Sequence, residues 1–464
     1  MTGLARDLGK ILSNQQVLCL PEDLLAYAND ATFYFRSRVP DAVVLPHSTD
    51  EVAQVVKYAF ANEIPLVPRG AGSGLAGGCT PIQGGIVMDM KRMDKVVEID
   101  QSNLTAEVEA GLVLQNFYRQ VERRGLFYPP DPQSMTVCTL GGNIATRAGG
   151  PRAVKYGTTS NYVLGLEMVL PDGSIIHTGG KMVKQSAGYD LTHLMTGSEG
   201  TLGVITKANV RLLTLPPLHN TLLISCSTLD QAAEAVSAII ASGTVPAMLE
   251  FLNQGAIELM NNYISPPVPL NYEAYLLLDV DGSQGQIDSD TQKIREVCND
   301  LGVPDLRVVE NREEAATYWN ARSKLYPLLS TIMKRVITED ITVPRNRIPE
   351  LVRSVQAIAA DIGILIGLGG HAGDGNIHPT ILQLDINEEI NLKAQQAIAQ
   401  IIRKGLDLGG TISGEHGIGV HKQEFMEMEF GKVQIELMKR IKSAFDPKGI
   451  MNPGKIWLEG GDGQ

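Results

Sequence analysis

The feature that most constrains this fold is a glycine-rich loop, PRGAGSG at 68–74, directly after the apolar segment 64–67. Such a segment is typical of a strand, and a G-x-G-x-x-G spacing starts at Gly72. In dinucleotide-binding proteins this loop opens a helix whose N-terminus faces the pyrophosphate. Here GCTPI at 78–82 follows without a helical period, and a second near-match from Gly367 also starts no helix. The loop therefore argues against a Rossmann NAD site and indicates an anion cradle of backbone N–H groups.

The chain around this loop is organised as alternating strands and helices. Residues 41–74 predict a strand, a helix and a second strand, and Ser48-x-x-Glu51 predicts a capping box at the start of that helix. Residues 128–157 show little periodicity and predict a long irregular segment with a function. The best domain boundary is Leu215-Pro216-Pro217, because prolines end the strand pattern. Beyond it, strands and helices alternate with connections that suit antiparallel pairing, so we expect an α+β fold.

Composition and charge exclude several classes of protein. The 464 residues carry 40 Lys and Arg against 52 Asp and Glu, and the net charge of −12 argues against binding nucleic acid through the overall field. Five widely separated cysteines argue against a disulfide framework and against an iron–sulfur cluster. No apolar run reaches the ~18 residues of a membrane helix, and the start MTGLARDLGK lacks a signal-peptide core. We therefore expect a cytoplasmic protein with at most peripheral membrane contact.

Three ordered motifs resemble the FAD-binding signatures of the vanillyl-alcohol oxidase and p-cresol methylhydroxylase superfamily. They are PRGAGSG at 68–74, DPQSMTVCTLGGNIATRAGG at 131–150 and GSEGTLGVIT at 197–206, and the resemblance covers nearly the whole chain. It implies an FAD-binding domain of two subdomains at 1–215. It also implies an α+β substrate (cap) domain with an antiparallel sheet at 216–420, which carries a metal site, and a helical segment at 421–464 that returns to the FAD domain.

The same resemblance assigns FAD-binding roles residue by residue. Backbone amides of residues 69–74 would hold the pyrophosphate, residues 141–146 would line the isoalloxazine and ribityl region, and residues 200–205 would lie near the flavin or adenine. Family members with covalent flavin often have a histidine at the position of Ser73, so the FAD is expected to be non-covalent. The full expected set is Pro68, Arg69, Gly70, Ala71, Gly72, Ser73, Gly74, Pro132, Ser134, Gly141, Gly142, Asn143, Thr146, Glu199, Gly200, Gly203, Ile205 and Asn452.

Two glycine-rich motifs in the C-terminal half concentrate histidine and glutamate. GGHAGDGNIHP contains His371 and His378, and SGEHGIG contains Glu415 and His416. Side chains seven residues apart lie on opposite faces of a regular strand, but the intervening glycines allow the chain to fold back so that both imidazoles converge. Two histidines and one carboxylate form a common catalytic metal set that leaves a position open for substrate.

These motifs also resemble the C-terminal signatures of the flavin-linked D-2-hydroxyacid dehydrogenases. That group includes D-lactate dehydrogenases, D-2-hydroxyglutarate dehydrogenases and the catalytic subunit of glycolate oxidase. The resemblance implies a divalent metal, zinc or another ion such as manganese, on the positions matching His371, His378 and Glu415. It implies His416 as the catalytic base.

The resemblance also identifies a residue for the substrate carboxylate. Arg322 matches the family position, and a guanidinium can grip a carboxylate in bidentate fashion. Lys334 and Arg335 are weaker alternatives. Some relatives that take dicarboxylates place Asn where this chain has Thr380, a departure that favours a small monocarboxylate.

The resulting hypothesis is an FAD-dependent dehydrogenase that oxidises D-lactate or glycolate to the 2-keto acid. The metal and His416 would assist loss of the hydroxyl proton, and flavin N5 would accept the hydride. Electrons would pass to an external acceptor (a quinone, a partner iron–sulfur subunit or a soluble carrier), in a homodimer or a hetero-complex. Two alternatives stay open: a metal-free flavin oxidase that uses oxygen, and a non-catalytic flavoprotein subunit of a glycolate-oxidising complex, which would be expected to lose the histidine–glutamate set.

Overall fold

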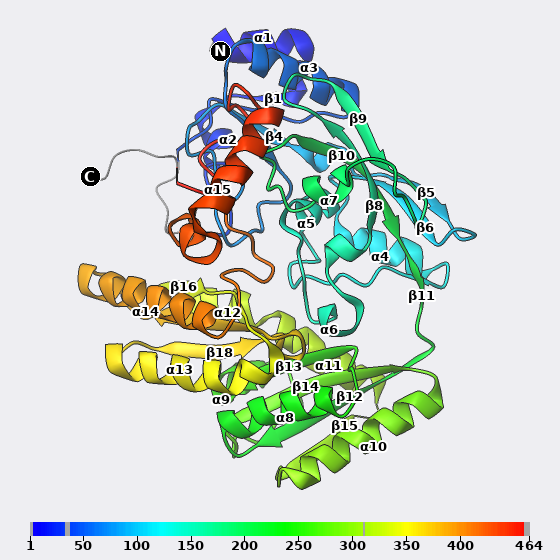
Figure 1. The fold of residues 1–464 in the computed structure, drawn as a ribbon, viewed down its shortest axis with the longest axis vertical. Coiled ribbons are helices and arrows are strands. Elements are labelled where there is room, and N and C mark those ends of the chain that lie inside the picture. Colours follow the sequence, from blue (N-terminus) through cyan, green and yellow to red (C-terminus); the bar gives the residue numbers. More distant parts are fainter. Residues whose placement is uncertain (1–2, 33–37, 310, 459–464) are drawn as a thin grey trace. The chain divides into compact units, whose positions relative to one another are not determined.

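The computed structural model describes residues 3–32, 38–309 and 311–458 (Figure 1). By its internal contacts the chain forms two compact units. Unit 1 comprises residues 1–149, 158–215 and 415–464, and unit 2 comprises residues 150–157 and 216–414. Each unit is therefore assembled from segments that are separated in the sequence.

The first sheet of unit 1 leads into the glycine-rich loop. Its strands lie in the order β1 (Val17–Leu18), β2 (Ala42–Val44), β4 (Ile86–Asp89) and β3 (Leu66–Arg69), and β2, β4 and β3 run parallel. Parallel strands need cover, and α1 (Gly3–Ile11) and α3 (Thr49–Ala61) bury apolar residues in the same core, while α2 (Pro21–Leu25) follows β1. The capping box of α3 is half formed: Ser48 Oγ accepts from Glu51 N (3.3 Å), but the Glu51 carboxylate accepts from His47 N (2.7 Å).

The second sheet of unit 1 is antiparallel. Its strand order is β5 (Val96–Asp100), β6 (Thr105–Glu109), β10 (Val204–Arg211), β8 (Val163–Val169) and β9 (Ile175–Gly179). The connecting segments contain the helices α4 (Leu114–Glu122) and α7 (Leu191–Met195). The short strands β7 (Leu126–Phe127) and β11 (Leu213–Thr214) form a separate pair. The segment expected to be irregular at 128–157 contains α5 (Leu140–Thr146) and α6 (Ala153–Tyr156). Thr139 Oγ1 caps α5 by accepting from Gly142 N (3.3 Å), and the glycines in this helix hide it from a search for apolar periodicity.

The C-terminal segment completes unit 1. After α15 (Met426–Phe445), which is kinked at Gly431 (φ 67°), the chain runs beside β3. Leu66 N donates to Ile450 O (2.8 Å), and Leu66 O accepts from Asn452 N (2.8 Å). Ile450 and Met451 are buried in the same core as α3, so the end of the chain is part of this fold.

Unit 2 is an antiparallel sheet covered on both faces. Its order is β15 (Asp305–Val309), β12 (Leu218–Cys226), β14 (Ala274–Gly282), β13 (Met248–Asn253), β18 (Ile366–Gly370), β19 (Asn376–Gln383) and β16 (Arg335–Thr338), and β17 (Ile341–Thr342) pairs with β19. Every residue of β14 but the last is buried, which requires cover on both faces. Besides α6, its helices in the described residues are α8 (Leu229–Ala241), α9 (Gln254–Met260), α10 (Gln284–Asp300), α11 (Arg312–Ser323), α12 (Leu325–Ile332), α13 (Ile348–Ile362) and α14 (Glu388–Asp407).

The α+β class and the antiparallel sheet of the second half are as expected. The functional domains expected at 1–215, 216–420 and 421–464 stay a prediction. The two units are defined by contacts and not by function, and they place 150–157 in unit 2 and 415–420 in unit 1. In the described ranges no helix combines the length and the apolar character needed to cross a bilayer.

Candidate active site

The glycine-rich loop after β3 packs against the start of α5. A Cβ atom on Gly70 would lie 2.3 Å from Thr139 Oγ1, and one on Gly72 (φ +70°) would lie 2.1 Å from Arg69 Nη2. Thr139 Oγ1 is the group that caps α5 at Gly142 N. The structure thus brings the expected pyrophosphate loop next to the expected isoalloxazine segment, and glycine is required where the two meet.

A cavity of about 370 Å³ opens beside this loop, within unit 1. Two cations, Arg69 and Lys91, and two acids, Asp89 and Asp94, line it. Lys91 Nζ donates to Tyr27 Oη (2.8 Å) and lies 3.0 Å from Asp89 Oδ2. The glycine backbone of this wall can offer N–H groups to an anion. Tyr27 and Lys91 were not predicted from the sequence. The lining residues include Ala26, Tyr27, Arg69, Gly70, Ala71, Asp89, Lys91, Asp94, Gly111, Val113 and Thr139.

Several buried polar atoms of unit 1 have no hydrogen-bond partner among the described residues. They include Asn143 Nδ2, Ser198 Oγ and Asn452 Oδ1. An unpaired buried polar atom costs ~1–3 kcal/mol, so these atoms indicate where polar groups of a bound molecule would fit. Because Asn143 and Asn452 both belong to the expected FAD set, the residues present fit FAD.

Glu199 and Asn452 also join separate loops of unit 1. The Glu199 carboxylate accepts from the backbone N–H groups of Ile418 and Gly419 (both 2.8 Å). Burial raises the pKa of Glu199, and these two donors oppose the rise. Asn452 Nδ2 donates to the carbonyls of Glu199 (2.6 Å) and Gly78 (2.8 Å). Both residues therefore brace the loops that form the cradle.

The rest of the expected FAD set lies in the same unit, and its contacts with FAD stay a prediction. Ile205 is buried in β10, and Thr146 Oγ1 donates to Gly142 O (3.3 Å) within α5. The other members are Pro132 and Ser134 before α5, Gly141 in α5, Gly200 and Gly203 before β10, Pro68 in β3, and Ser73 and Gly74 in the loop itself.

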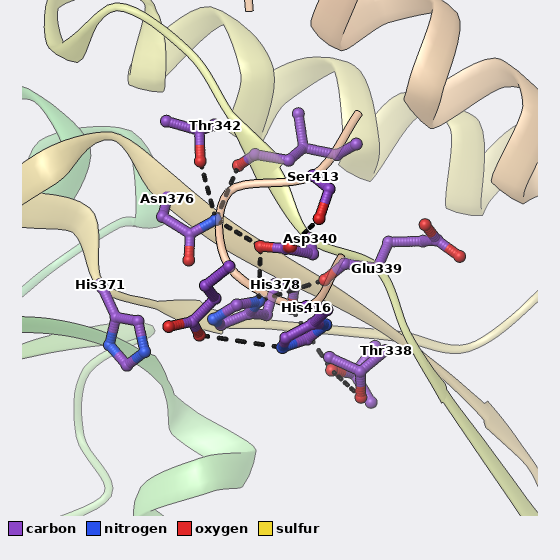
Figure 2. Close-up of polar contacts among 12 residues, drawn as sticks. Thr338, Glu339, Asp340, Thr342, His371, Asn376, His378, Ser413 and His416 are labelled. Atoms are coloured by element: carbon purple, nitrogen blue, oxygen red, sulfur yellow. Dashed lines mark hydrogen bonds and ion pairs between the residues drawn. The ribbon is translucent and has the colours of Figure 1, made fainter. Parts of the chain in front are cut away.

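In unit 2, His371 follows β18 and His378 lies in β19 (Figure 2). Their rings lie 5.1 Å apart at 88°, and each offers a nitrogen within 4.8 Å of one on the other. His371 Nδ1 bonds the Glu250 carboxylate, and His378 Nδ1 lies 3.2 Å from the Glu339 carbonyl oxygen. Both rings therefore donate through Nδ1 and present Nε2, which is the arrangement of metal-bound histidines. The structure brings the two histidines together, and their chemistry fits a divalent ion.

Arg322, the expected carboxylate-binding residue, lies buried in α11 and pairs with Glu250 of β13. Its Nε and Nη2 lie 2.8 Å and 2.6 Å from Glu250 Oε2. Burial alone would raise the pKa of Glu250, but the charge of Arg322 and the hydrogen bond from His371 outweigh it and the pKa is lowered. Lys334 is exposed, and Arg335 donates to Asn391 Oδ1 (2.9 Å). Of the three candidate cations, Arg322 is the one that shares a carboxylate with an expected metal ligand.

Glu415 and His416 begin the segment that returns to unit 1. Glu415 Oε1 and His416 Nε2 lie 3.8 Å apart, and both side chains are largely buried. Gly149 leaves room for this carboxylate, because a Cβ atom there would lie 2.7 Å from Glu415 Oε2. The preceding turn is held in unit 2, where Ser413 Oγ donates to Asp340 Oδ2 (2.8 Å).

Comparison with family models matches two consecutive parts of the chain. Residues 40–179 match an FAD binding domain, and residues 215–456, more than half of the chain, match the C-terminal domain of FAD linked oxidases. The chain belongs to the FAD-linked oxidases. It is an enzyme of the oxidoreductase class, and FAD is its cofactor.

Named relatives of this FAD-linked oxidase support the same family. The chain is 44% identical in sequence to the glycolate oxidase subunit GlcD of Bacillus subtilis, over 94% of this chain and 92% of that protein. It is 34% identical to a D-lactate dehydrogenase of Anaerostipes hadrus, over 96% of each. Among solved structures, p-cresol methylhydroxylase matches with a TM-score of 0.81 at 18% identity, over 98% of this chain and 96% of that one. The superfamily and the fold inferred from the motifs are confirmed.

Two buried acids beside the histidines of this oxidase were not predicted. Asp340 Oδ1 accepts from Asn376 Nδ2 (2.8 Å) and lies 3.9 Å from His378 Nδ1, while its other oxygen accepts from Ser413 (Figure 2). Glu250 is the second. For Glu250 the available signal was an acid inside the apolar, strand-like run MLEFLN at 248–253, because a buried acid needs partners. Asp340, in TEDIT at 338–342, had no such signal.

Proposed function

We propose that this FAD-linked oxidase oxidises a small D-2-hydroxy acid, D-lactate or glycolate, to the 2-keto acid. The observation that carries the proposal is the pair of histidines that present Nε2 beside the buried Arg322–Glu250 pair. The names of two relatives, a glycolate oxidase subunit and a D-lactate dehydrogenase, support the substrate class. Thr380 in β19, in place of the Asn of dicarboxylate-using relatives, supports a monocarboxylate.

We assign a divalent metal, zinc or manganese, to His371, His378 and Glu415. Gly414 supports the third ligand, because it is closely packed in unit 2: a Cβ atom on it would lie 2.3 Å from Thr342 Oγ1. Glu415 is the next residue, so its Cα is ~3.8 Å along the chain from this fixed point. The covalent connection alone therefore keeps the Glu415 backbone close to the loop that carries the histidines.

The protein groups divide the chemistry among them. When bound, FAD supplies a hydride acceptor and the divalent ion lowers the pKa of the substrate hydroxyl. His416 accepts the hydroxyl proton, a task that suits an imidazole near neutral pH. Arg322 binds the substrate carboxylate with a guanidinium whose direction is already set by Glu250. Ser73 in the glycine loop supports non-covalent FAD.

Electrons then leave for an external acceptor, which we assign to a quinone, an iron–sulfur subunit or a soluble carrier. All five cysteines are free thiols. The relative named as a subunit supports a hetero-complex, with a homodimer as the other arrangement. A cytoplasmic location with at most peripheral membrane contact stays a prediction from the sequence.

An anaerobic titration tests the proposed reaction. Visible spectra are recorded while D-lactate, glycolate, D-2-hydroxyglutarate and L-lactate are added, before and after treatment with a chelator. We expect D-lactate or glycolate to bleach the flavin band, chelation to abolish the bleaching and a divalent ion to restore it. A flavin that none of these acids reduces would overturn the substrate class. Reduction that survives metal removal, with stoichiometric peroxide under air, would favour the metal-free oxidase.

His416→Ala tests the assignment of the base. Loss of a positioned general base slows the chemical step by ~10²–10⁴-fold, so we expect flavin reduction in a single anaerobic turnover to slow by that factor. The flavin-to-protein ratio should stay at the wild-type value. His193→Ala is the matched control, because His193 is half-exposed and pairs with Asp190 at the surface. A wild-type reduction rate in His416→Ala would remove this residue as the base.

A further inference from the structure

Glu250 is a buried carboxylate that serves two functional side chains at once. Its side chain is fully buried in β13. Oε2 accepts from Arg322 through Nε (2.8 Å) and Nη2 (2.6 Å), and Oε1 bonds His371 Nδ1. A buried charge without partners is strongly destabilising, and these two donors supply the partners.

Strand pairing sets the place of this carboxylate. Glu250 pairs with Leu277 of β14, and its neighbour Phe251 pairs with Gly370 of β18, the residue before His371. β13 thus lies between two strands inside the sheet. A side chain on such an interior strand is held more rigidly than one on a loop, and it can hold its own partners in place.

We infer that Glu250 is a positioning residue that couples the metal site to the substrate-carboxylate site. One carboxylate oxygen holds His371 in the tautomer with its proton on Nδ1, so that Nε2 is presented to the metal. The other oxygen sets the direction of the Arg322 guanidinium. The inference rests on the proposed function and deepens it, because it names the residue that joins its two recognition elements.

A Glu250→Gln substitution keeps the size of the side chain, which can no longer accept hydrogen bonds from both Arg322 and His371. An amide has one accepting oxygen and one donating nitrogen, whereas Glu250 accepts from Arg322 on one oxygen and from His371 on the other. If the amide oxygen serves Arg322, the NH₂ group faces His371 Nδ1, which must then accept. The imidazole proton moves to Nε2 and blocks the lone pair that would bind the metal.

The test measures Mn²⁺ affinity by calorimetry on the FAD-loaded wild type, Glu250→Gln and Asp279→Asn. Asp279 is the matched control: a buried acid in the neighbouring strand β14 that accepts from Trp319 Nε1 (3.0 Å) and from Thr221. We expect Glu250→Gln to bind Mn²⁺ about 10–100-fold more weakly, as for other groups that orient a ligating histidine. Asp279→Asn should match the wild type. Glu250→Gln should also raise the Michaelis constant for substrate.

The outcomes distinguish this inference from the function on which it rests. Equal Mn²⁺ affinity in the wild type and Glu250→Gln would overturn the inference and leave the metal site standing. An equal loss in Asp279→Asn would also overturn it, because the effect would then be general to buried acids of the sheet. A wild-type protein that binds no divalent ion would overturn the proposed metal site, and the inference with it.

A measurement on the wild type covers the case in which Glu250→Gln does not fold. ¹⁵N NMR of the metal-free protein with labelled histidine reports which ring nitrogen carries the proton, and His371→Asn assigns the signal. We expect His371 with its proton on Nδ1. A His371 signal with the proton on Nε2 would overturn the inference.

Discussion

The role of each histidine depends on its burial and on the group that contacts Nδ1, as a comparison of His219 with His371 and His378 shows. His371 and His378 are largely buried, and each has an acceptor at Nδ1. His219 is half-exposed (48%), and its Nδ1 lies 3.5 Å from the buried carboxylate of Asp279. The hydrogen bond to Asp279 raises the pKa of His219, against the opposing effects of burial and of nearby arginines. A residue in this setting affects stability rather than chemistry.

The raised pKa of His219 predicts a pH-dependent stability. Because the folded state holds the proton more tightly than the unfolded state, the stabilisation is full below the ordinary pKa of 6.5 and is lost as pH rises through the raised pKa. We expect wild type to melt at a higher temperature than His219→Gln at about pH 5.5, with the difference disappearing at about pH 8.5. The gain is at most ~1 kcal/mol, because the imidazole of His219 is half-exposed. Scanning calorimetry at both pH values checks this, and a difference that grows with pH would contradict it.

At the scale of elements, the FAD cradle depends on how closely a loop meets the start of a helix. Gly70→Ala places a methyl group 2.3 Å from Thr139 Oγ1, so the loop or the cap of α5 must move. Loss of a cap alone costs ~1 kcal/mol. We expect FAD affinity to fall by about tenfold, the equivalent of ~1.4 kcal/mol, in a fluorescence titration of the apoprotein.

Gly285→Ala is the matched control for this substitution. Gly285 lies in α10, and a Cβ atom there would have no heavy atom within 4 Å. Alanine in a helix is favoured over glycine by ~0.5–1 kcal/mol, so this variant should be as stable as the wild type or more so, with unchanged FAD binding. Equal FAD affinities in Gly70→Ala and Gly285→Ala would show that the loop tolerates the methyl group.

At the scale of the whole molecule, unit 1 depends on residues from the end of the chain. Truncation after Asp446 would remove Ile450 and Met451 from the core and Asn452 from its bonds to Glu199 and Gly78. Burial of two such apolar side chains stabilises by ~3–6 kcal/mol, a large fraction of the net stability of a domain. We expect the truncated protein to lose its flavin on gel filtration and to become sensitive to proteolysis in unit 1. Full flavin content with wild-type melting would contradict this dependence.

Local features and the family can be read from short stretches of the chain. The glycine loop at 68–74, the end of α4 near Gly125 and the start of α3 at Ser48 depend on residues only a few positions apart, so local patterns reveal them. The three ordered motifs indicate the vanillyl-alcohol oxidase and p-cresol methylhydroxylase superfamily, and the histidine–glutamate motifs resemble those of the flavin-linked D-2-hydroxyacid dehydrogenases. Helix α5 is not evident from such local patterns, because its threonine cap and two glycines leave no apolar period.

Which acids pair with the side chains of the candidate site depends on packing between distant segments. Glu250 is separated by 72 residues from Arg322 and by 121 from His371, and Asp340 by 73 from Ser413. Glu250 meets His371 because β13 and β18 pair in a particular register, and it meets Arg322 because α11 packs into the same core as β13. No short segment of sequence specifies either arrangement. An acid in an apolar strand has the same local pattern whether it lies at a sheet edge or inside the sheet. Its burial and its hydrogen-bond partners, which determine what it can do, are set by packing between distant segments.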